Sequence, residues 1–231
     1  IVYTAAIKED NLDLLAAKEA NIPCVERSVM LGILCAQYDN LIAVSGSHGK
    51  TTTTSMITRL LIDEKADPTA IVDWKIHSID SNSRIGKSQN MVCEACEYVD
   101  TFLQLYPAIS VITNIDDDHL DYFGNIENLI ASFRKFASQT SKTIFVNGDD
   151  ENSMKAVADL DVPVITFGFG EHNMYRAENM CEKDKVCEQF SIIKNNSTLC
   201  SLNLSVPGKY NVYNALAAAA VADFIGIDGA T

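Results

Sequence analysis

One stretch of the sequence has the residue types and spacing of a phosphate-binding loop. Gly46-Ser47-His48-Gly49-Lys50-Thr51 follows the apolar run Leu41–Ser45 and precedes a segment with helical periodicity. Glycines let a backbone approach a phosphate closely, and the N–H groups at a helix start point at the anion. Lys50 can reach the β- and γ-phosphates of a nucleotide, and the Thr51 hydroxyl can hold Mg²⁺. The pattern therefore predicts a site for ATP and Mg²⁺.

The loop departs from the general pattern at one position. That pattern has a glycine five residues before Gly49, where this sequence has Val44, so the loop is a shortened G-x-x-G-K-T form. A chance match is the alternative, and with Gly at about 7% of residues it is on the order of a 1% event. The polar run Thr51–Thr54 is a poor helix start by intrinsic propensity, which favours a functional reason for it.

Acidic residues and a histidine follow two other apolar runs. Glu94 follows Met91–Cys93, and Asp116-Asp117-Asp118-His119 comes shortly after Ile109–Thr113. Ligands of open α/β sheets bind at the carboxyl ends of the strands, carboxylates repel one another unless solvated or neutralised, and neutral imidazole binds metals. The alternatives are a solvated acidic loop for the second group and a salt-bridged or edge-exposed carboxylate for Glu94. The nearby phosphate loop favours a Mg²⁺ site for the second group.

Two asparagines open the last helical segment of the chain. Asn211 and Asn214 are three residues apart and so share one face of a helix, where they could hydrogen-bond an adenine. Capping of the helix by Asn211 is the alternative, and the two roles are compatible.

Apolar runs alternate with amphipathic segments over most of the chain, which predicts an α/β fold. It is a P-loop-type, mostly parallel sheet with helices on both faces. The predicted strands are Leu41–Ser45, Met91–Ala95, Ile109–Thr113, Thr143–Asn147 and Pro163–Phe167, and the predicted helices Thr51–Glu64, Ile126–Ser138, Glu151–Leu160 and Asn211–Ile225. Val186–Ile193 and Thr198–Val206 break the alternation and predict an antiparallel hairpin, turned at Asn195-Asn196, at one edge.

The first 40 residues predict a separate β-α-β-α piece. Its expected elements are the strand Ile1–Ile7, the helix Asp10–Ala20, the strand Ile22–Val25 and the helix Ser28–Gln37. We therefore expect a partial Rossmann-like domain in residues 1–40, followed by the nucleotide-binding domain in residues 41–231.

Composition excludes several classes of protein. The 231 residues carry a net charge of −13 without any Lys/Arg-rich run, so a nucleic-acid partner is not expected. No apolar stretch is long and uncharged enough to span a bilayer, so no membrane partner is expected either. The seven cysteines are odd in number and irregularly spaced, and no leader segment precedes them, which favours free thiols in the cytoplasm. Cys93-x-x-Cys96 lacks the second pair that a zinc site needs.

Taken together, these segments resemble the Mur ligases. Gly46-Ser-His-Gly-Lys-Thr-Thr52 is similar to the family's ATP loop, and Glu94-Ala-Cys-Glu-Tyr98 to its acidic metal-binding segment. Asn114-Ile-Asp-Asp-Asp-His-Leu-Asp121 is similar to its Asn-x-x-x-Asp-His motif, and Val206-Pro-Gly-Lys-Tyr-Asn-Val-Tyr-Asn-Ala215 to its adenine-contacting segment. Tyr3–Asn11 resembles the end of the family's N-terminal UDP-binding domain. The likeness covers nearly the whole chain in the family's order.

The resemblance implies an ATP-dependent ligase of peptidoglycan precursor synthesis. In the family, a substrate carboxylate attacks the γ-phosphate of ATP to give an acyl phosphate, and an amine then displaces phosphate to form the amide. The implied catalytic residues are Lys50, Glu94 and His119. Thr51 and Glu94 would bind one Mg²⁺ and His119 a second, and Asn211 and Asn214 would contact adenine. The ATP phosphates would be held by Gly46, Ser47, His48, Gly49, Lys50, Thr51 and Thr52.

The resemblance also implies a division of the protein. Residues 1–40 would be the C-terminal part of the UDP-substrate-binding domain, and residues 41–231 the central ATP-binding domain. The family's C-terminal domain would lie outside this chain, so the isolated chain is expected to be inactive.

Two departures from the family pattern bear on the substrate. Tyr210 stands where relatives often have His. Other Mur ligases have a carbamylated lysine about 14 residues after the metal histidine, where this chain has Phe133 followed by Arg134. The branch that adds L-alanine to UDP-N-acetylmuramate also lacks this lysine, so we expect that substrate pair.

Three alternatives stay open. A murein peptide ligase would join a tripeptide to the same sugar acid. Folylpolyglutamate synthase fits the Asp116–His119 segment less well. A non-catalytic nucleotide-binding module is the third, against which Lys50, Glu94 and His119 argue.

Overall fold

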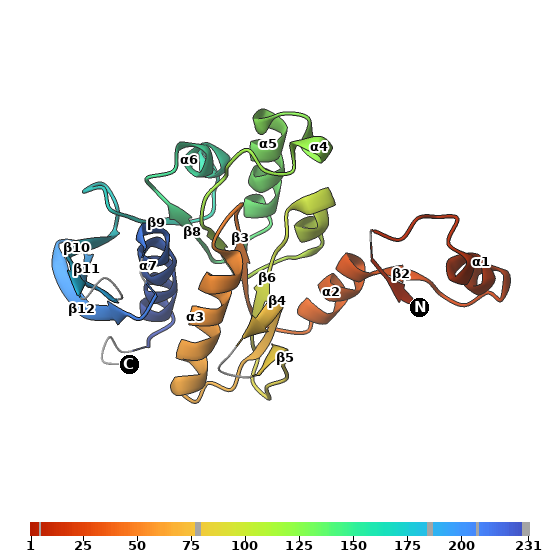
Figure 1. Cartoon of the computed structure of the whole chain (residues 1–231), viewed down its shortest axis with the longest axis horizontal. Coiled ribbons are helices and arrows are strands. Elements are labelled where there is room, and N and C mark those ends of the chain that lie inside the picture. Colours follow the sequence, from red (N-terminus) through yellow and green to blue (C-terminus); the bar gives the residue numbers. More distant parts are fainter. Residues whose placement is uncertain (5, 77–79, 184–186, 207, 228–231) are drawn as a thin grey trace.

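The computed structural model describes residues 1–4, 6–76, 80–183, 187–206 and 208–227. Ten strands within these residues form one sheet, in the order β12-β11-β10-β9-β8-β7-β3-β6-β4-β5 (Figure 1). The strands from β10 to β4 in this order run parallel to their neighbours, while β11 and β12 at one edge and β5 at the other are antiparallel. The strands are β3 (Asn40–Ser45), β4 (Thr69–Ile76), β5 (Ser81–Arg84), β6 (Asn90–Glu94), β7 (Ile109–Ile112), β8 (Thr143–Asn147), β9 (Val164–Gly168), β10 (Tyr175–Lys183), β11 (Cys187–Lys194) and β12 (Ser197–Leu204).

Helices cover both faces of this sheet. Helices α3 (Lys50–Asp63) and α7 (Lys209–Phe224) pack on one face. Helices α2 (Arg27–Cys35), α5 (Ile126–Ser138) and α6 (Glu151–Val157) and the 3-10 segment η2 (Tyr98–Gln104) pack on the other. Short helix α4 (Leu120–Phe123) precedes α5. Because side chains alternate along a strand, β3 contributes to both cores.

The central strand β3 shows this division residue by residue. Ile42 and Val44 belong to the core beneath α3 and α7, and Leu41 and Ala43 to the core beneath α5. All four are at most 2% exposed, which explains why this parallel strand is an unbroken apolar run. The same run carries the chain to the carboxyl edge of the sheet, where the phosphate loop begins.

Most of the expected architecture is confirmed. The sheet is mostly parallel, helices lie on both faces, and the hairpin β11–β12 extends one edge. Val186, where the hairpin was expected to begin, lies outside the described residues. Strands β4, β5 and β10 were not predicted from the sequence, and the segments of β5 and β10 are mostly polar. Helix α6 ends at Val157 rather than Leu160 because Ala158 is extended (ψ 136°).

The N-terminal segment projects from the main body (Figure 1). Strands β1 (Val2–Tyr3) and β2 (Val25–Glu26) pair in parallel, with helix α1 (Leu12–Glu19) between them. Asn11 caps α1, since its side chain accepts from the N–H groups of Asp13 and Leu14. The strands predicted at Ile1–Ile7 and Ile22–Val25 are wrong in their bounds, because the paired stretches are only two residues long.

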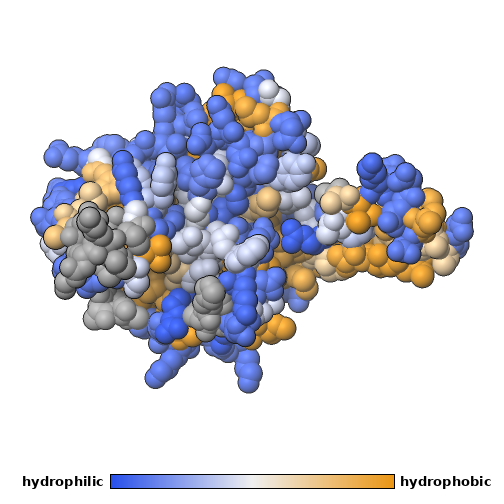
Figure 2. All heavy atoms as spheres, viewed as in Figure 1, coloured by the Kyte–Doolittle hydropathy of each residue, from blue (hydrophilic) through white to orange (hydrophobic). Residues whose placement is uncertain are grey.

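Apolar side chains remain on the surface of this segment, and Figure 2 shows them along its length. The exposed ones are Ile1, Val2, Ile7, Leu12, Leu15 and Ile22. Helix α2 also exposes Val29, Ile33 and Leu34, but it packs against η2 and places Cys35 in the core of the large sheet.

Candidate active site

The phosphate loop joins the end of β3 to the first turn of α3. Gly46 and Gly49 both have positive φ, 136° and 87°, which favours glycine. A Cβ at Gly46 would lie 2.0 Å from Thr113 Oγ1, and a Cβ at Gly49 would lie 2.3 Å from Asn214 Oδ1. Glycine is therefore required at both places by conformation and by space.

The loop is held by the residues that follow β7. The side chain of Asn114 brackets His48, accepting from its N–H at 2.9 Å and donating to its carbonyl at 2.9 Å. The Thr113 hydroxyl donates to the same carbonyl at 2.6 Å. The N–H of Asp116 donates to the Ser47 hydroxyl at 2.9 Å. The Asn114–Asp116 segment thus acts first as a support for the loop's backbone.

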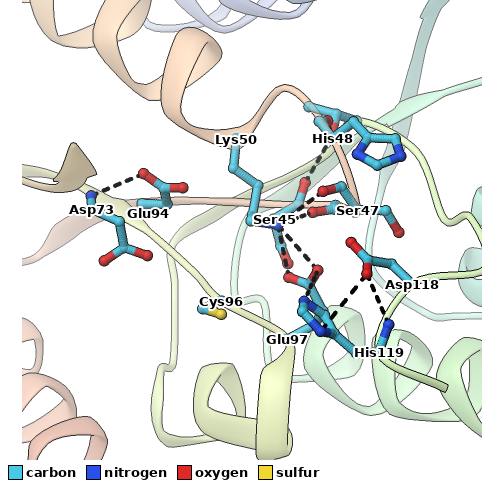
Figure 3. A network of polar contacts seen from close by, with 12 residues as sticks. Ser45, Ser47, His48, Lys50, Asp73, Glu94, Cys96, Glu97, Asp118 and His119 are labelled. Atoms are coloured by element: carbon cyan, nitrogen blue, oxygen red, sulfur yellow. Dashed lines mark hydrogen bonds and ion pairs between the residues drawn. The ribbon is translucent and has the colours of Figure 1, made fainter. Parts of the chain in front are cut away.

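Lys50 turns back over the loop and meets a buried carboxylate. Its Nζ donates to the carbonyls of Gly46 at 2.5 Å and Ser47 at 3.1 Å, and to Glu97 Oε1 at 3.0 Å (Figure 3). Glu97 is 0% exposed, and its Oε2 lies 3.0 Å from the same Nζ without a hydrogen-bonding angle. A buried carboxylate with spare acceptor capacity therefore faces the phosphate loop.

Glu94, at the end of β6, lies on the other side of Lys50 (Figure 3). It accepts from the Thr51 hydroxyl at 2.8 Å and from the N–H of Asp73 at 3.0 Å. Burial raises the pKa of Glu94, and the hydrogen bonds from Asp73 and Thr51 only partly oppose that effect. The Thr51–Glu94 pair expected for one cation is thus brought together.

His119 meets Glu97 and Asp118 rather than Glu94. Its Nε2 lies 3.9 Å from Glu97 Oε1, and its Nδ1 lies 3.7 Å from Asp118 Oδ1. One ligand atom of each of these three residues lies within 4.8 Å of the others. Lys50 is bonded to the same carboxylate, so Glu97 links the phosphate loop to the histidine.

A cavity of about 510 Å³ opens beside the loop. Its walls include His48 and Gly49 from the loop, Asn147 and Asp149 from the carboxyl end of β8, and Asn214 from α7. Thr52 and Tyr210 also line it. Polar walls next to a phosphate loop suit the base and sugar of a nucleotide.

The two asparagines of α7 are placed differently. Asn214 is 6% exposed, and its side chain lies between Gly49 and the Thr53 hydroxyl, which donates to it at 3.2 Å. Asn211 is not among the described residues that line the cavity, although its Oδ1 lies 3.5 Å from Asn214 Nδ2.

A second cavity, of about 290 Å³, lies between the N-terminal segment and the sheet. Glu94, Asp73 and Cys96 form part of its wall, and Arg27 at the start of α2 faces them. Arg27 Nη1 lies 3.7 Å from Asp73 Oδ1. Arg27 is the one basic residue among the described residues that line this cavity.

Comparison with known proteins decides the family. A family model for the Mur ligase middle domain matches residues 44–222, well over half of the chain. The chain belongs to the Mur ligase family. This Mur ligase chain is 44% identical over 230 residues to a UDP-N-acetylmuramate–L-alanine ligase from Caldanaerobacter subterraneus subsp. tengcongensis, covering 99% of this chain and 50% of the relative. The chain thus spans about half the length of the curated relatives it matches.

Solved structures agree on the fold. The UDP-N-acetylmuramate-alanine ligase of Thermotoga maritima matches this Mur ligase with a TM-score of 0.85 and 28% identity, covering 97% of this chain and 51% of that one. The murein peptide ligase structure from Neisseria meningitides gives a TM-score of 0.87 at 22% identity, covering 98% of this chain and 75% of that one, and shows the fold alone.

The site residues of this Mur ligase fit a hard divalent cation. Thr51 Oγ1 and the carboxylates of Glu94, Glu97 and Asp118 are oxygen donors of the kind that Mg²⁺ takes. The buried Glu97 Oε2 accepts no hydrogen bond from the described residues, so its lone pairs are open to a cation, although it lies 3.0 Å from Lys50 Nζ. The donor chemistry therefore agrees with the cation that the sequence predicted.

Glu97 is the residue that the sequence analysis missed. Glu94 was chosen from the segment Glu94-Ala-Cys-Glu-Tyr98 because it ends the apolar strand. The structure shows that the chain continues across the carboxyl edge of the sheet, so the second glutamate of the same segment faces both Lys50 and His119. Its spacing three residues after the strand end was the available signal.

Among the described residues, no helix is long and apolar enough to cross a membrane. In the same part of the chain, Cys24, Cys35, Cys93, Cys96 and Cys200 are free thiols, so no disulfide joins any two of these five.

Proposed function

We propose that the protein containing this Mur ligase chain joins L-alanine to the carboxylate of UDP-N-acetylmuramate at the expense of ATP. The observation that carries the proposal is the position of the phosphate loop between two cavities. The larger cavity includes Gly49 in its wall, and the smaller includes Glu94, which is hydrogen-bonded to Thr51 of the loop. A nucleotide in one cavity and an acceptor in the other would therefore meet across Thr51 and Glu94. The similarity to ligases named for this reaction supports the choice of substrates.

The loop would hold the ATP phosphates. Lys50 already offers its ammonium group beside the loop backbone, and the N–H groups at the start of α3 point toward the same space. Asn214 in the wall of the larger cavity would contact the adenine, with Asn211 behind it. The remaining loop residues, Gly46, Ser47, His48, Thr51 and Thr52, would surround the phosphates.

Two acidic positions would hold the cations. Thr51 and Glu94 would bind one Mg²⁺, and His119 would bind a second together with Glu97. A carboxylate and a triphosphate repel each other, and bound cations supply the positive charge that offsets this repulsion. Glu97 would serve both the phosphate loop and the second cation position, because it accepts a hydrogen bond from Lys50 and lies near His119.

The smaller cavity would receive the acceptor. Its wall carries Asp73 and Glu94, so an acceptor carboxylate entering it needs a positive partner. Arg27 supplies one, since its guanidinium faces this wall and is half exposed. We propose that Arg27 orients the acceptor carboxylate toward the nucleotide.

The division of the protein follows the same proposal. Residues 1–40 would complete the UDP-substrate-binding domain, and residues 41–231 would form the ATP-binding domain. Since the chain spans about half the length of its relatives, we expect it to bind nucleotide without turnover when isolated. The free cysteines suit a reaction in the cytoplasm.

A phosphate-release assay on the full-length protein tests the proposed reaction. UDP-N-acetylmuramate, ATP and Mg²⁺ are supplied with single amino acids or with the tripeptide L-alanyl-γ-D-glutamyl-meso-diaminopimelate. We expect release with free L-alanine. Release only with the tripeptide would instead identify a murein peptide ligase, and no release with any acceptor would identify a non-catalytic nucleotide-binding module. Robust ligation of L-alanine by the isolated chain would contradict the expectation that the chain alone is inactive.

A further inference from the structure

Glu97 and His119 come from different parts of the chain, and one side-chain hydrogen bond joins the turns that carry them. Asp100 N donates to the carbonyl of Glu97 at 2.9 Å, and Tyr122 N donates to the carbonyl of His119 at 3.0 Å. The Tyr122 hydroxyl then donates to Asp100 Oδ2 at 3.0 Å. These contacts form a closed circuit, because at the site itself Glu97 Oε1 and His119 Nε2 are 3.9 Å apart.

Asp100 is also tied to the body of the domain. Its other carboxylate oxygen accepts a hydrogen bond from the hydroxyl of Ser132 on α5. Asp100 thus contacts three separate segments: its own turn, α4 through Tyr122, and α5 through Ser132. A residue with these three contacts fixes the turn that carries Glu97 relative to the helix that follows His119.

The backbone shows why such a tie is needed. Val99 and Asp100 have φ of 54° and 57°, and His119 has φ of 55°. Residues other than glycine rarely adopt this left-handed conformation, and a β-branched residue such as Val99 does so only when its surroundings hold it there. Both turns at the site are therefore strained, and the hydrogen bonds of Asp100 oppose their relaxation.

Aromatic contacts fill the space that this circuit of contacts encloses. The ring of Tyr98 lies 4.8 Å from that of His119 and 6.2 Å from that of Tyr122, measured between centroids. Tyr98 thus packs between the imidazole and the tyrosine that holds Asp100. A change in the Asp100–Tyr122 contact would reach His119 through this packing as well as through the backbone.

We infer that the Asp100–Tyr122 hydrogen bond is a clasp that sets the separation of Glu97 and His119 and thereby the divalent-cation affinity of the site. Asp100 and Tyr122 are positioning residues, since neither is among the three residues of the cation cluster. The inference rests on the proposed function, because it assumes that Glu97 and His119 bind a cation.

The test compares Tyr122→Phe with Asp100→Asn. Tyr122→Phe removes the clasp without changing charge, so we expect the dissociation constant for Mn²⁺, followed by electron paramagnetic resonance, to rise about three- to tenfold. Asp100→Asn keeps an oxygen acceptor for Tyr122, an amide donor for Ser132 and a residue that tolerates the left-handed region, so it should stay much closer to wild type than Tyr122→Phe. Tyr106→Phe makes the same chemical change at a side chain that is 73% exposed and is the matched control.

The full-length protein gives a second readout that a general loss of stability would not produce. In Tyr122→Phe, the Mg²⁺ concentration for half-maximal phosphate release should rise by a similar factor, while the rate at saturating Mg²⁺ stays near wild type. Wild-type Mn²⁺ affinity in Tyr122→Phe, or an equal loss in Tyr106→Phe, would overturn the clasp. Failure of the wild-type protein to bind Mn²⁺ would instead refute the cation site and the proposed function with it.

Discussion

Lys50 Nζ lies 3.0 Å from Glu97 Oε1, so the lysine of the phosphate loop is paired with a carboxylate that has no exposed surface. A buried carboxylate needs a positive partner, and in this structure Lys50 is that partner. When a triphosphate enters the loop, Lys50 can turn to it only if another cation replaces it at Glu97. A divalent cation between Glu97 and His119 would do so and would thereby couple nucleotide binding to cation binding.

This pairing predicts the outcome of removing the lysine. Lys50→Met leaves Glu97 buried without its lysine partner, so we expect the free energy of unfolding to fall by about 3 kcal/mol in urea denaturation. Phosphate release by the full-length protein should be abolished. Adding Glu97→Gln to Lys50→Met should restore much of the lost stability without restoring activity.

The exposed pair Lys155–Glu151 is the matched control for that experiment. Its Nζ–Oε1 distance is 2.8 Å, but the two side chains are 56% and 84% exposed. Lys155→Met should therefore cost less than about 1 kcal/mol. Equal losses at Lys50 and Lys155, or strictly additive effects of the Lys50 and Glu97 changes, would contradict the buried pair.

Glu94 predicts a pH dependence of stability. Burial raises its pKa in the folded protein above the ordinary value of 4.5. Between these two pKa values the folded protein binds more protons than the unfolded chain, so the free energy of unfolding falls as the pH rises through this window. Glu94→Gln cannot ionise and lacks this loss. Urea unfolding from pH 4.5 upward should therefore show wild type losing stability relative to Glu94→Gln, and parallel curves would contradict the raised pKa.

The sequence predicted the elements that depend on short-range patterns. The phosphate loop, its preceding strand and its following helix could be placed because an apolar run, two glycines and a periodic helix adjoin one another. Helix α5 was predicted with its bounds from the helical spacing of its apolar residues, and in the structure Asn125 caps it and five of its residues are buried. Strand β10 was not predicted because its inward residues, Tyr175 and Ala177, alternate with Arg176 and Glu178 in a stretch of otherwise polar composition.

The contacts of the site depend on tertiary structure and could be predicted only in part. Thr51 and Glu94, which the family resemblance assigned to one cation, lie together because β3 and β6, which lead to them, are neighbours in the sheet. His119 was expected to hold a second cation with no partner named for it, and the turn after β6 brings Glu97 to it. That turn includes Val99 in a left-handed conformation, which a valine's own preferences argue against. No local pattern predicts a backbone that tertiary contacts impose.

Arg27 should affect the acceptor and not the nucleotide. Arg27→Ala removes the basic side chain from the smaller cavity, so in the full-length protein we expect the KM for UDP-N-acetylmuramate to rise about tenfold or more, as expected for a hydrogen bond to a charged group. The KM for ATP should stay unchanged. Arg27→Lys keeps the charge but loses the bidentate geometry, so its KM for UDP-N-acetylmuramate should lie between those of wild type and Arg27→Ala.

Arg59 is the control for Arg27. Its side chain is 55% exposed, close to the 54% of Arg27, and it pairs with Asp63 on the surface of α3. Arg59→Ala should leave both KM values unchanged. A rise in the KM for ATP in Arg27→Ala, with the acceptor KM unaffected, would remove Arg27 from the acceptor site.

Gly49 and Gly226 separate the effect of space from that of conformation. Their φ values are 87° and 88°, but a Cβ at Gly49 would lie 2.3 Å from Asn214 Oδ1, while a Cβ at Gly226 would have no neighbour within 4 Å among the described residues. Gly226→Ala should cost only the conformational strain, about 1 kcal/mol of unfolding free energy, and leave ADP affinity unchanged. Gly49→Ala should cost more and weaken ADP binding, because Asn214 in the cavity wall must move. Urea unfolding and calorimetric ADP titration measure both, and equal effects of the two substitutions would show that Asn214 has no part in the nucleotide site.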